Sequence, residues 1–218
     1  SGIAWLQKTD SPAALPPTSR ALREPNGLLA VGGSLTPDWL IHAYRRGVFP
    51  WYSAEQPILW WAPDPRAVLL PSEFRISRSL ARSIRKRGYE TRIDTAFDEV
   101  IEACAGPRHG MAGTWITREM HDAYGALDRR GLAHSFETWH GDRLVGGLYG
   151  VCLGRAFFGE SMFTRETDAS KVALTRLVAE CRRHDVPLID CQMPSPHLTR
   201  LGSHNLPRSK FESWLGQL

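Results

Sequence analysis

Two short apolar runs of this chain contain acidic and amide side chains. Glu160 lies in residues 159–163, and Asp190 and Gln192 lie in residues 188–192, about thirty residues further along. A buried charge requires a partner, so an ordinary core strand avoids such residues. The pattern indicates that these three side chains hold something polar.

Side-chain alternation places Glu160 among apolar neighbours. If residues 155–163 are extended, Phe158, Glu160 and Met162 share one face of the strand. We therefore expect a carboxylate that is largely surrounded by apolar groups. Two interpretations remain open at this point, a functional acid or a structural acid that backbone amides satisfy.

A predicted helix connects the two polar runs. Asp168 is suited to the N-cap position, and an apolar stripe with i, i+3, i+4, i+7 spacing follows it. A strand, a helix and a second strand within about thirty-five residues are typical of a crossover between parallel strands. If these strands are neighbours, Glu160, Asp190 and Gln192 converge on one cleft. The stripe consists of Leu174, Leu177, Val178 and Cys181.

A basic amphipathic helix is predicted over residues 75–87. Ile76, Leu80 and Ile84 form its apolar stripe, and no acidic residue lies between the two ends of the segment. A solvated helix face is the usual interpretation of such a run, but an unbalanced basic face also suits nucleic-acid phosphates. The candidate phosphate contacts are Arg78, Arg82, Arg85 and Lys86.

Composition restricts the class of protein. The chain has 218 residues and a formal net charge of +4, enough length for a good core in one domain or in one domain with a smaller companion. We find no apolar run of membrane-spanning length and no leader pattern, so we expect a soluble cytoplasmic protein. The four cysteines are scattered without a C-x-x-C pair, which argues against a zinc site and a disulfide framework.

The first 64 residues differ from the rest of the chain in their pattern of predicted strands, helices and turns. Residues 28–31 predict a short strand, and Thr36 before Pro37 predicts a helix start. The turn at residues 63–65 predicts a boundary between a small N-terminal domain, residues 1–64, and a larger domain, residues 65–218. Trp51, which lies beside a proline near a loop, is a candidate for stacking on a nucleic-acid base, whereas Trp60 and Trp61 are expected to be core residues.

The middle of the chain predicts a helix followed by a β-hairpin. The hairpin is expected over residues 134–151, with glycines at positions 146, 147 and 150 that weaken a strand unless a bulge or a close ligand approach needs them. His134, Ser135 and Cys191 do not occur in a recognised nucleophile motif, so we do not expect nucleophilic catalysis.

Nine short runs, which follow one another from about residue 20 to residue 210, closely resemble sequences of one protein family. This family is the bacterial leucyl/phenylalanyl-tRNA–protein transferases. The runs are LREPNGLLA at 22–30, GVFPW at 47–51, ILWWAPDPR at 58–66, TWI at 114–116, AHS at 133–135, LVGGLYG at 144–150, GESMF at 159–163, ASK at 169–171 and IDCQ at 189–192.

The resemblance implies an α+β protein, with a small N-terminal α/β domain and a larger C-terminal acetyltransferase-like (GNAT-like) domain. It implies transfer of leucine or phenylalanine from aminoacyl-tRNA to proteins that begin with arginine or lysine, as a tag for the N-degron pathway of protein degradation. It implies neither a membrane nor a DNA partner. Residues 163–168 lack the R-x-x-G-x-G/A pattern that cradles coenzyme A, so we expect no cofactor.

The family's chemistry gives the candidate residues roles. We expect Asp190 and Gln192 to orient the acceptor amine, with Asp190 as the proton acceptor, and Glu160 to pair with the cationic acceptor side chain, although these roles are interchangeable. Two alternatives stay open, an acyltransferase with another donor and a tRNA-binding module without catalysis. The expected amino-acid pocket contains Leu148, Phe157 and Leu177, and Trp51 and Trp115 are the candidates for holding the terminal adenosine.

Overall fold

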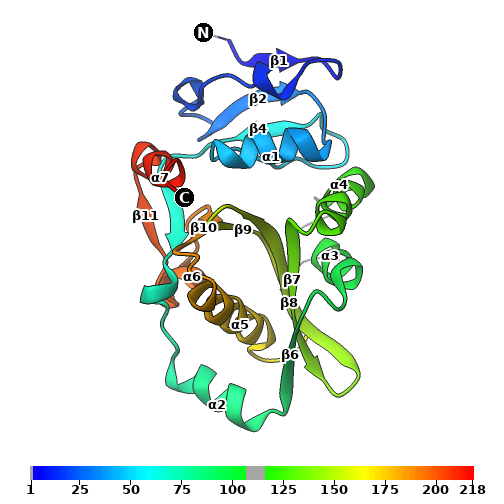
Figure 1. Cartoon of the computed structure of the whole chain (residues 1–218), viewed down its shortest axis with the longest axis vertical. Coiled ribbons are helices and arrows are strands. Elements are labelled where there is room, and N and C mark those ends of the chain that lie inside the picture. The colour runs from blue at the N-terminus through cyan, green and yellow to red at the C-terminus, as the bar shows by residue number, and fades with distance from the viewer. Residues whose placement is uncertain (1, 107–115) are drawn as a thin grey trace.

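The computed structural model describes residues 2–106 and 116–218 and contains two β-sheets (Figure 1). The smaller sheet has the order β1-β2-β4-β3, and the larger has the order β11-β5-β10-β9-β8-β7-β6. The strands of the smaller sheet are β1 (Ala4–Leu6), β2 (Leu28–Gly32), β3 (Phe49–Pro50) and β4 (Leu59–Trp61). Those of the larger are β5 (Arg66–Leu69), β6 (Tyr89–Ile93), β7 (Ala133–His140), β8 (Arg143–Leu153), β9 (Ala156–Thr164), β10 (Leu188–Gln192) and β11 (His204–Leu206).

The helices cover both faces of the larger sheet, with α5 on one side and α3 and α4 on the other (Figure 1). The mixture of helices with two mainly antiparallel sheets confirms the expected α+β class. The helices are α1 (Pro37–Arg45), α2 (Arg78–Lys86), α3 (Phe97–Ala105), α4 (Arg118–Arg129), α5 (Ala169–Arg183), α6 (Pro196–Arg200) and α7 (Arg208–Leu215).

Helix α1 joins the smaller sheet to the larger one. Thr36 caps the helix by accepting a hydrogen bond from the backbone N–H of Trp39, and Pro37 occupies the first turn, as the sequence predicts. Trp39 stacks on buried Trp60 of the smaller sheet, with ring centroids 5.7 Å apart. Tyr44 is fully buried in the same core as α3 and α4.

The predicted crossover between parallel strands is confirmed. Strands β9 and β10 pair in parallel, with Leu188 opposite Ala156 and Asp190 opposite Phe158, and α5 connects them. Beyond Phe158 this pairing ends. The polar residues of both strands therefore lie where β9 and β10 separate.

The alternation expected along β9 is wrong after Glu160, because β9 contains a bulge. Tyr149 of β8 is opposite Ser161 and Gly150 is opposite Gly159, so Glu160 is the extra residue. Phe158 packs in the core that includes α1, whereas Met162 packs against the core beneath α5. Glu160 and Met162 thus do not share a face, and the bulge redirects Glu160.

The predicted N-cap position of Asp168 is confirmed, but its side chain does not cap α5. Asp168 is the N-cap residue, but it has a φ of 62° and makes no capping hydrogen bond. Its carboxylate instead accepts a hydrogen bond from Ser83 Oγ of α2 at 2.7 Å and lies 3.3 Å from Lys171 Nζ. Asp168 therefore connects α2 to the start of α5.

The buried face of α2 differs from the predicted stripe. Leu80 and Ser83 are buried, whereas Ile76 and Ile84 are 47% and 37% exposed. Only Leu80 of the stripe enters the core, and Ser83 on the buried face donates its hydrogen bond to Asp168. All four basic side chains predicted to contact phosphates are exposed.

The glycines of β8 accompany a register shift at Gly150, as predicted, and the close neighbours at Gly146 and Gly150 are other parts of the protein rather than a ligand. A Cβ on Gly146 would lie 2.6 Å from the carbonyl carbon of Ala169 at the start of α5, and one on Gly150 would lie 2.3 Å from the backbone oxygen of Phe158. Glycine thus lets α5 and β9 pack directly on β8. Within the two described stretches of the chain, we find no helix with the length and apolar character of a membrane span.

Candidate active site

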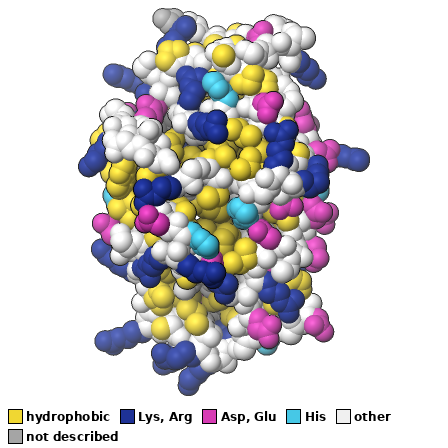
Figure 2. Space-filling model, viewed as in Figure 1, with side chains coloured by type: hydrophobic (Ala, Val, Ile, Leu, Met, Phe, Trp, Pro, Cys, Tyr) yellow, Lys and Arg dark blue, Asp and Glu magenta, His cyan; other side chains and the backbone are white. Residues whose placement is uncertain are grey.

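A cavity of about 430 Å³ opens where β9 and β10 separate beneath the smaller sheet. Figure 2 shows hydrophobic side chains reaching the surface in the middle of the face viewed there. The apolar wall includes Leu148, Leu174, Leu177 and Ile189, and Trp51 and Trp61 come from the segments around the smaller sheet. The polar lining residues are Glu160, Ser161, Asp190, Gln192, Ser195, His197 and Asn26.

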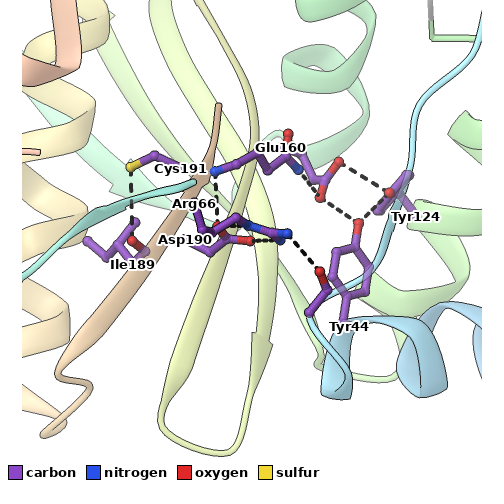
Figure 3. Close-up of polar contacts among 9 residues, drawn as sticks. Tyr44, Arg66, Tyr124, Glu160, Ile189, Asp190 and Cys191 are labelled. Carbon is purple, nitrogen blue, oxygen red and sulfur yellow. Dashed lines mark hydrogen bonds and ion pairs between the residues drawn. The ribbon is translucent and has the colours of Figure 1, made fainter. Parts of the chain in front are cut away.

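Glu160 is held by two tyrosines from different helices (Figure 3). Tyr44 Oη of α1 donates a hydrogen bond to Glu160 Oε1 at 2.5 Å, and Tyr124 Oη of α4 lies 3.2 Å from Oε2. Burial and the Glu160 charge hold the pKa of both tyrosines well above the ordinary value, so their hydroxyls stay protonated.

The Glu160 carboxyl has a pKa raised to about 8. Burial is the main cause, and the Asp190 charge adds to it, whereas the tyrosine hydrogen bonds and the Arg66 charge act in the opposite direction. Glu160 is therefore a carboxyl group that gains or loses its proton close to neutral pH.

Asp190 forms a buried ion pair with Arg66. Arg66 Nε and Nη2 donate to the two carboxylate oxygens at 2.8 Å and 2.6 Å, and both side chains are at most 1% exposed. Arg66 also donates from Nη1 to the backbone oxygen of Gly47 and lies between the rings of Phe49 and Phe211, 4.9 Å and 4.7 Å from their centroids. This bidentate geometry fixes Asp190 rigidly.

Gln192 connects the ion pair to Glu160. Its backbone N–H donates to Asp190 Oδ1 at 2.9 Å, and its side-chain Nε2 donates to Glu160 Oε1 at 3.2 Å. The pairing of β10 with β5 shifts register at this point, and Gln192 has a φ of 64°. A left-handed conformation is unusual for glutamine and is typical of functional positions.

Together these contacts create a preorganised polar site against an apolar wall. Glu160 is suited to proton transfer near neutral pH, and the Gln192 amide is suited to orienting a small polar group beside it. Burial raises the pKa of the neighbouring Cys191 thiol further above its ordinary value, so this thiol stays protonated and is a poor nucleophile.

The structure brings together most, but not all, of the predicted site residues. Glu160, Asp190 and Gln192 line the cavity, as do Trp51, which is 49% exposed, and the pocket residues Leu148 and Leu177.

Other predicted site residues lie elsewhere. Phe157 is 2% exposed, packs against Phe136 and is not among the cavity-lining residues. The basic residues of α2 lie at the far end of the molecule from the smaller sheet (Figure 1). Trp115 lies outside the described residues.

Four residues of the site were not predicted from the sequence. Arg66 lies at the start of an apolar strand. Because a buried Asp190 requires a cationic partner, an arginine within an apolar strand is a residue that could have been predicted to pair with it. Tyr44 and Tyr124 occur on predicted apolar helix faces, where a buried tyrosine hydroxyl also requires a partner. Trp61 was assigned to the core, but it lines the cavity, and its Nε1 donates to the Trp51 backbone oxygen at 2.7 Å.

Comparison with solved structures gives weak likenesses. One is the structure of L-PGS from Bacillus licheniformis, with 12% identity and a TM-score of 0.42 over 71% of this chain and 50% of that one. Another is a GCN5-related N-acetyltransferase from Kribbella flavida, with 11% identity and a TM-score of 0.41 over 75% of this chain and 58% of that one. At these scores the likeness adds nothing to the assignment of function.

Comparison by sequence is far more specific. Residues 68–216 match the family described as leucyl/phenylalanyl-tRNA protein transferase, and residues 33–64 match the N-terminal domain of that family. Curated proteins called leucyl/phenylalanyl-tRNA–protein transferase are 59% identical in Azoarcus sp. (strain BH72), over 96% of this chain and 88% of that protein, and 55% identical in Thiobacillus denitrificans, over 93% and 89%. This chain belongs to the leucyl/phenylalanyl-tRNA protein transferase family.

Proposed function

We propose that this protein transfers leucine or phenylalanine from an aminoacyl-tRNA to the α-amino group of a protein that begins with arginine or lysine. The observation that carries the proposal is Glu160, held by two tyrosines and Gln192 beside an apolar pocket. Membership of the family supports both substrates.

The chemistry requires little beyond positioning and one proton transfer. The aminoacyl ester is already activated, so the acceptor amine must lose a proton and approach the ester carbonyl. An α-amine has an ordinary pKa of about 7.7–8.0, and the pKa of Glu160 is about 8. Because the two values match, the ionised Glu160 carboxylate is suited to take the proton from the acceptor ammonium.

Asp190 then has a different role from the one expected from the sequence. Both of its carboxylate oxygens bond to Arg66, and Oδ1 also accepts the backbone N–H of Gln192. Asp190 is therefore a positioning residue that fixes Gln192. The Gln192 amide gives one N–H to Glu160, which leaves its carbonyl oxygen to accept an N–H of the acceptor amine.

The transfer step balances without an external reagent. The neutral amine nitrogen attacks the ester carbonyl carbon, the bond from that carbon to the ribose oxygen breaks, and the extra proton on nitrogen passes to this ribose oxygen. The products are an amide and a free tRNA 3′ end. Glu160 keeps the proton that it took from the ammonium and releases it to solvent afterwards.

The cavity wall provides a place for each part of the donor. We assign the leucyl or phenylalanyl side chain to the apolar wall of Leu148, Leu174, Leu177 and Ile189, and the terminal adenosine to Trp51, whose indole ring is half-exposed at the cavity. Among the described lining residues the only acids are Glu160 and Asp190, and Arg66 neutralises Asp190, so Glu160 is the lining acid left to attract a cationic acceptor.

The proposal is tested by incubating the protein with leucyl-tRNA and a short peptide that begins with arginine, then weighing the peptide. We expect addition of one leucyl residue, and none to the same peptide with an acetylated N-terminus. The single variants Glu160→Gln and Gln192→Ala should each slow single-turnover transfer by about 100-fold or more.

A matched control is Glu102→Gln, which neutralises an exposed carboxylate of α3 and should transfer at the parental rate. If the protein binds tRNA but leaves the peptide unmodified, it is a tRNA-binding module. If it modifies the peptide only with acyl-coenzyme A, the donor is different and the proposal is wrong.

A further inference from the structure

A basic group borders the cavity and has no part in the proposed proton transfer. His197 of α6 lines the cavity, and Lys171 of α5 and Arg200 of α6 lie beside it. We infer that Lys171, His197 and Arg200 bind the backbone phosphates of the single-stranded 3′ end of the donor tRNA. This inference rests on the proposed function, because it assigns a position to the nucleotides that precede the terminal adenosine.

Helices α5 and α6 place Lys171 and Arg200 near His197, which lines the cavity. Lys171 lies one helical turn before Leu174, which lines the cavity, so both occupy the same face of α5. Arg200 lies three residues after His197 on α6 and is exposed. Within residues 2–106 and 116–218, Arg200 has no salt bridge, and Lys171 has one, to Asp168 at 3.3 Å.

The positive potential of the basic group reaches the cavity wall. The pKa of His197 is lowered, first by burial and then by the charges of Lys171 and Arg200, whereas the Asp168 charge acts in the opposite direction. The acids of the cavity, Glu160 and Asp190, lie on β9 and β10 instead. The cavity is therefore polarised, with Glu160 on one side, where the acceptor amine is proposed to bind, and a basic side that suits phosphates.

The basic group is also structurally connected to the basic helix α2. Ser83 of α2 bonds to Asp168, and Asp168 pairs with Lys171. The pKa of Asp168 is lowered by the Ser83 hydrogen bond and also by the charges of Lys171 and Arg87. In Figure 1, α5 lies between α2 at one end of the molecule and the smaller sheet at the other. A tRNA that contacts α2 can therefore reach the cavity along cationic side chains.

The experiment compares three donors that differ in their phosphates. Leucyl-adenosine has no phosphate, a leucylated CCA trinucleotide has the phosphates of the 3′ end, and leucyl-tRNA has the whole tRNA body. In the double variant Lys171→Gln/Arg200→Gln, we expect KM to rise by about tenfold for the trinucleotide and for leucyl-tRNA. Transfer from leucyl-adenosine should keep the parental rate, which also shows that the variant is folded.

Binding of unacylated CCA trinucleotide, followed by tryptophan fluorescence, tests the site without any transfer. The double variant should bind it about tenfold more weakly, with a log-log salt slope flatter by about 0.7 for each lost contact. Lys171→Arg/Arg200→Lys keeps both charges and should retain most of the affinity. Arg183→Gln, at the other end of α5, is the matched control and should change nothing.

Three results would overturn the inference. In the first, the double variant keeps the parental KM and affinity for the trinucleotide. In the second, the double variant loses transfer activity equally with all three donors. In the third, it loses transfer activity only when the acceptor peptide has an acidic second residue. The last result would assign the basic group to the acceptor protein. A parent protein that binds the trinucleotide but transfers leucine from none of the donors would refute the proposed function and leave the phosphate site standing.

Discussion

The two acids of the site differ in their partners. Asp190 faces a cation, Arg66, whose guanidinium bonds both of its oxygens. Glu160 faces neutral groups, two tyrosine hydroxyls and the Gln192 amide, so burial raises its pKa to about 8. This contrast supports our proposal that Glu160 transfers the proton and Asp190 positions Gln192.

The raised pKa of Glu160 predicts a stability that falls as pH rises. Glu160 is protonated in both folded and unfolded protein well below pH 4.5, the ordinary pKa of the group. Between about pH 4.5 and 8 the folded protein keeps this proton and the unfolded chain does not, so stability declines with pH and the loss is complete above about pH 8. Glu160→Gln should therefore lose less in Tm than the parent between pH 5 and pH 8.5, measured by differential scanning fluorimetry. Parallel Tm profiles of the two proteins would contradict the assignment.

The Arg66–Asp190 ion pair predicts a strong coupling in stability. Asp190→Leu or Arg66→Met alone leaves one buried charge without a partner, which costs about 3–5 kcal/mol. The double variant removes both charges and should cost much less than the sum of the single variants. Urea unfolding at pH 7 measures all four free energies of unfolding, and additive losses would show that the pair is not coupled.

At the scale of elements, two neighbouring strand irregularities create the site. The bulge in β9 turns Glu160 toward Tyr44 and Tyr124, and the register shift in β10 turns Gln192 toward Glu160. Both occur where β9 and β10 stop pairing. Bulges re-aim individual side chains in this way, and they are common beside active sites.

The left-handed backbone of Gln192 predicts a conflict between stability and activity. Gln192 has a φ of 64°, which costs a non-glycine residue about 1 kcal/mol. Gln192→Gly should relieve this strain, whereas Gln192→Ala should keep it. The free energy of unfolding of Gln192→Gly should therefore be about 1 kcal/mol higher than that of Gln192→Ala. Both variants lack the amide and should transfer about 100-fold more slowly. Chemical denaturation and single-turnover assays measure the two effects, and equal stability of the two variants would disprove the strain.

At the scale of the molecule, the cavity and the basic helix α2 lie in different regions connected by α5 (Figure 1). In Figure 2, Lys and Arg side chains are spread over the face viewed, and several lie at its lower end, where Figure 1 places α2. A small substrate would contact only the cavity. A macromolecular donor is large enough to contact both regions.

If α2 contacts the tRNA body, neutralising its basic face should weaken all tRNAs alike. The variant Arg78→Gln/Arg82→Gln/Arg85→Gln/Lys86→Gln should flatten the log-log salt dependence by about 0.9 for each lost contact, without changing the preference for the amino acid. The control removes four exposed arginines of equal total charge elsewhere, Arg20, Arg45, Arg129 and Arg183. Filter binding from low to high salt measures the tRNA affinity and its salt dependence for both variants. Equal log-log salt slopes for the α2 variant and the control variant would show that α2 is an ordinary solvated face.

Local structure and the polar residues of the candidate site are predictable from the amino-acid sequence. Apolar periodicity and capping residues predicted α1, α4, α5 and the β7–β8 hairpin, because these depend on contacts between nearby residues. Acids and an amide within apolar runs identified Glu160, Asp190 and Gln192, because a buried charge there requires a reason. The resemblance of the short runs to one family was sufficient to predict the family.

The contacts that these residues make with one another depend on how the whole chain folds. Arg66 is 124 residues from Asp190, and Tyr44 is 116 residues from Glu160, so no local pattern pairs them. The β9 bulge depends on pairing with β8, and the exposure of Ile76 and Ile84 depends on how α2 meets α5. Alternation and helical periodicity describe one element at a time, whereas these features arise from contacts between elements, which exist only once the chain has folded.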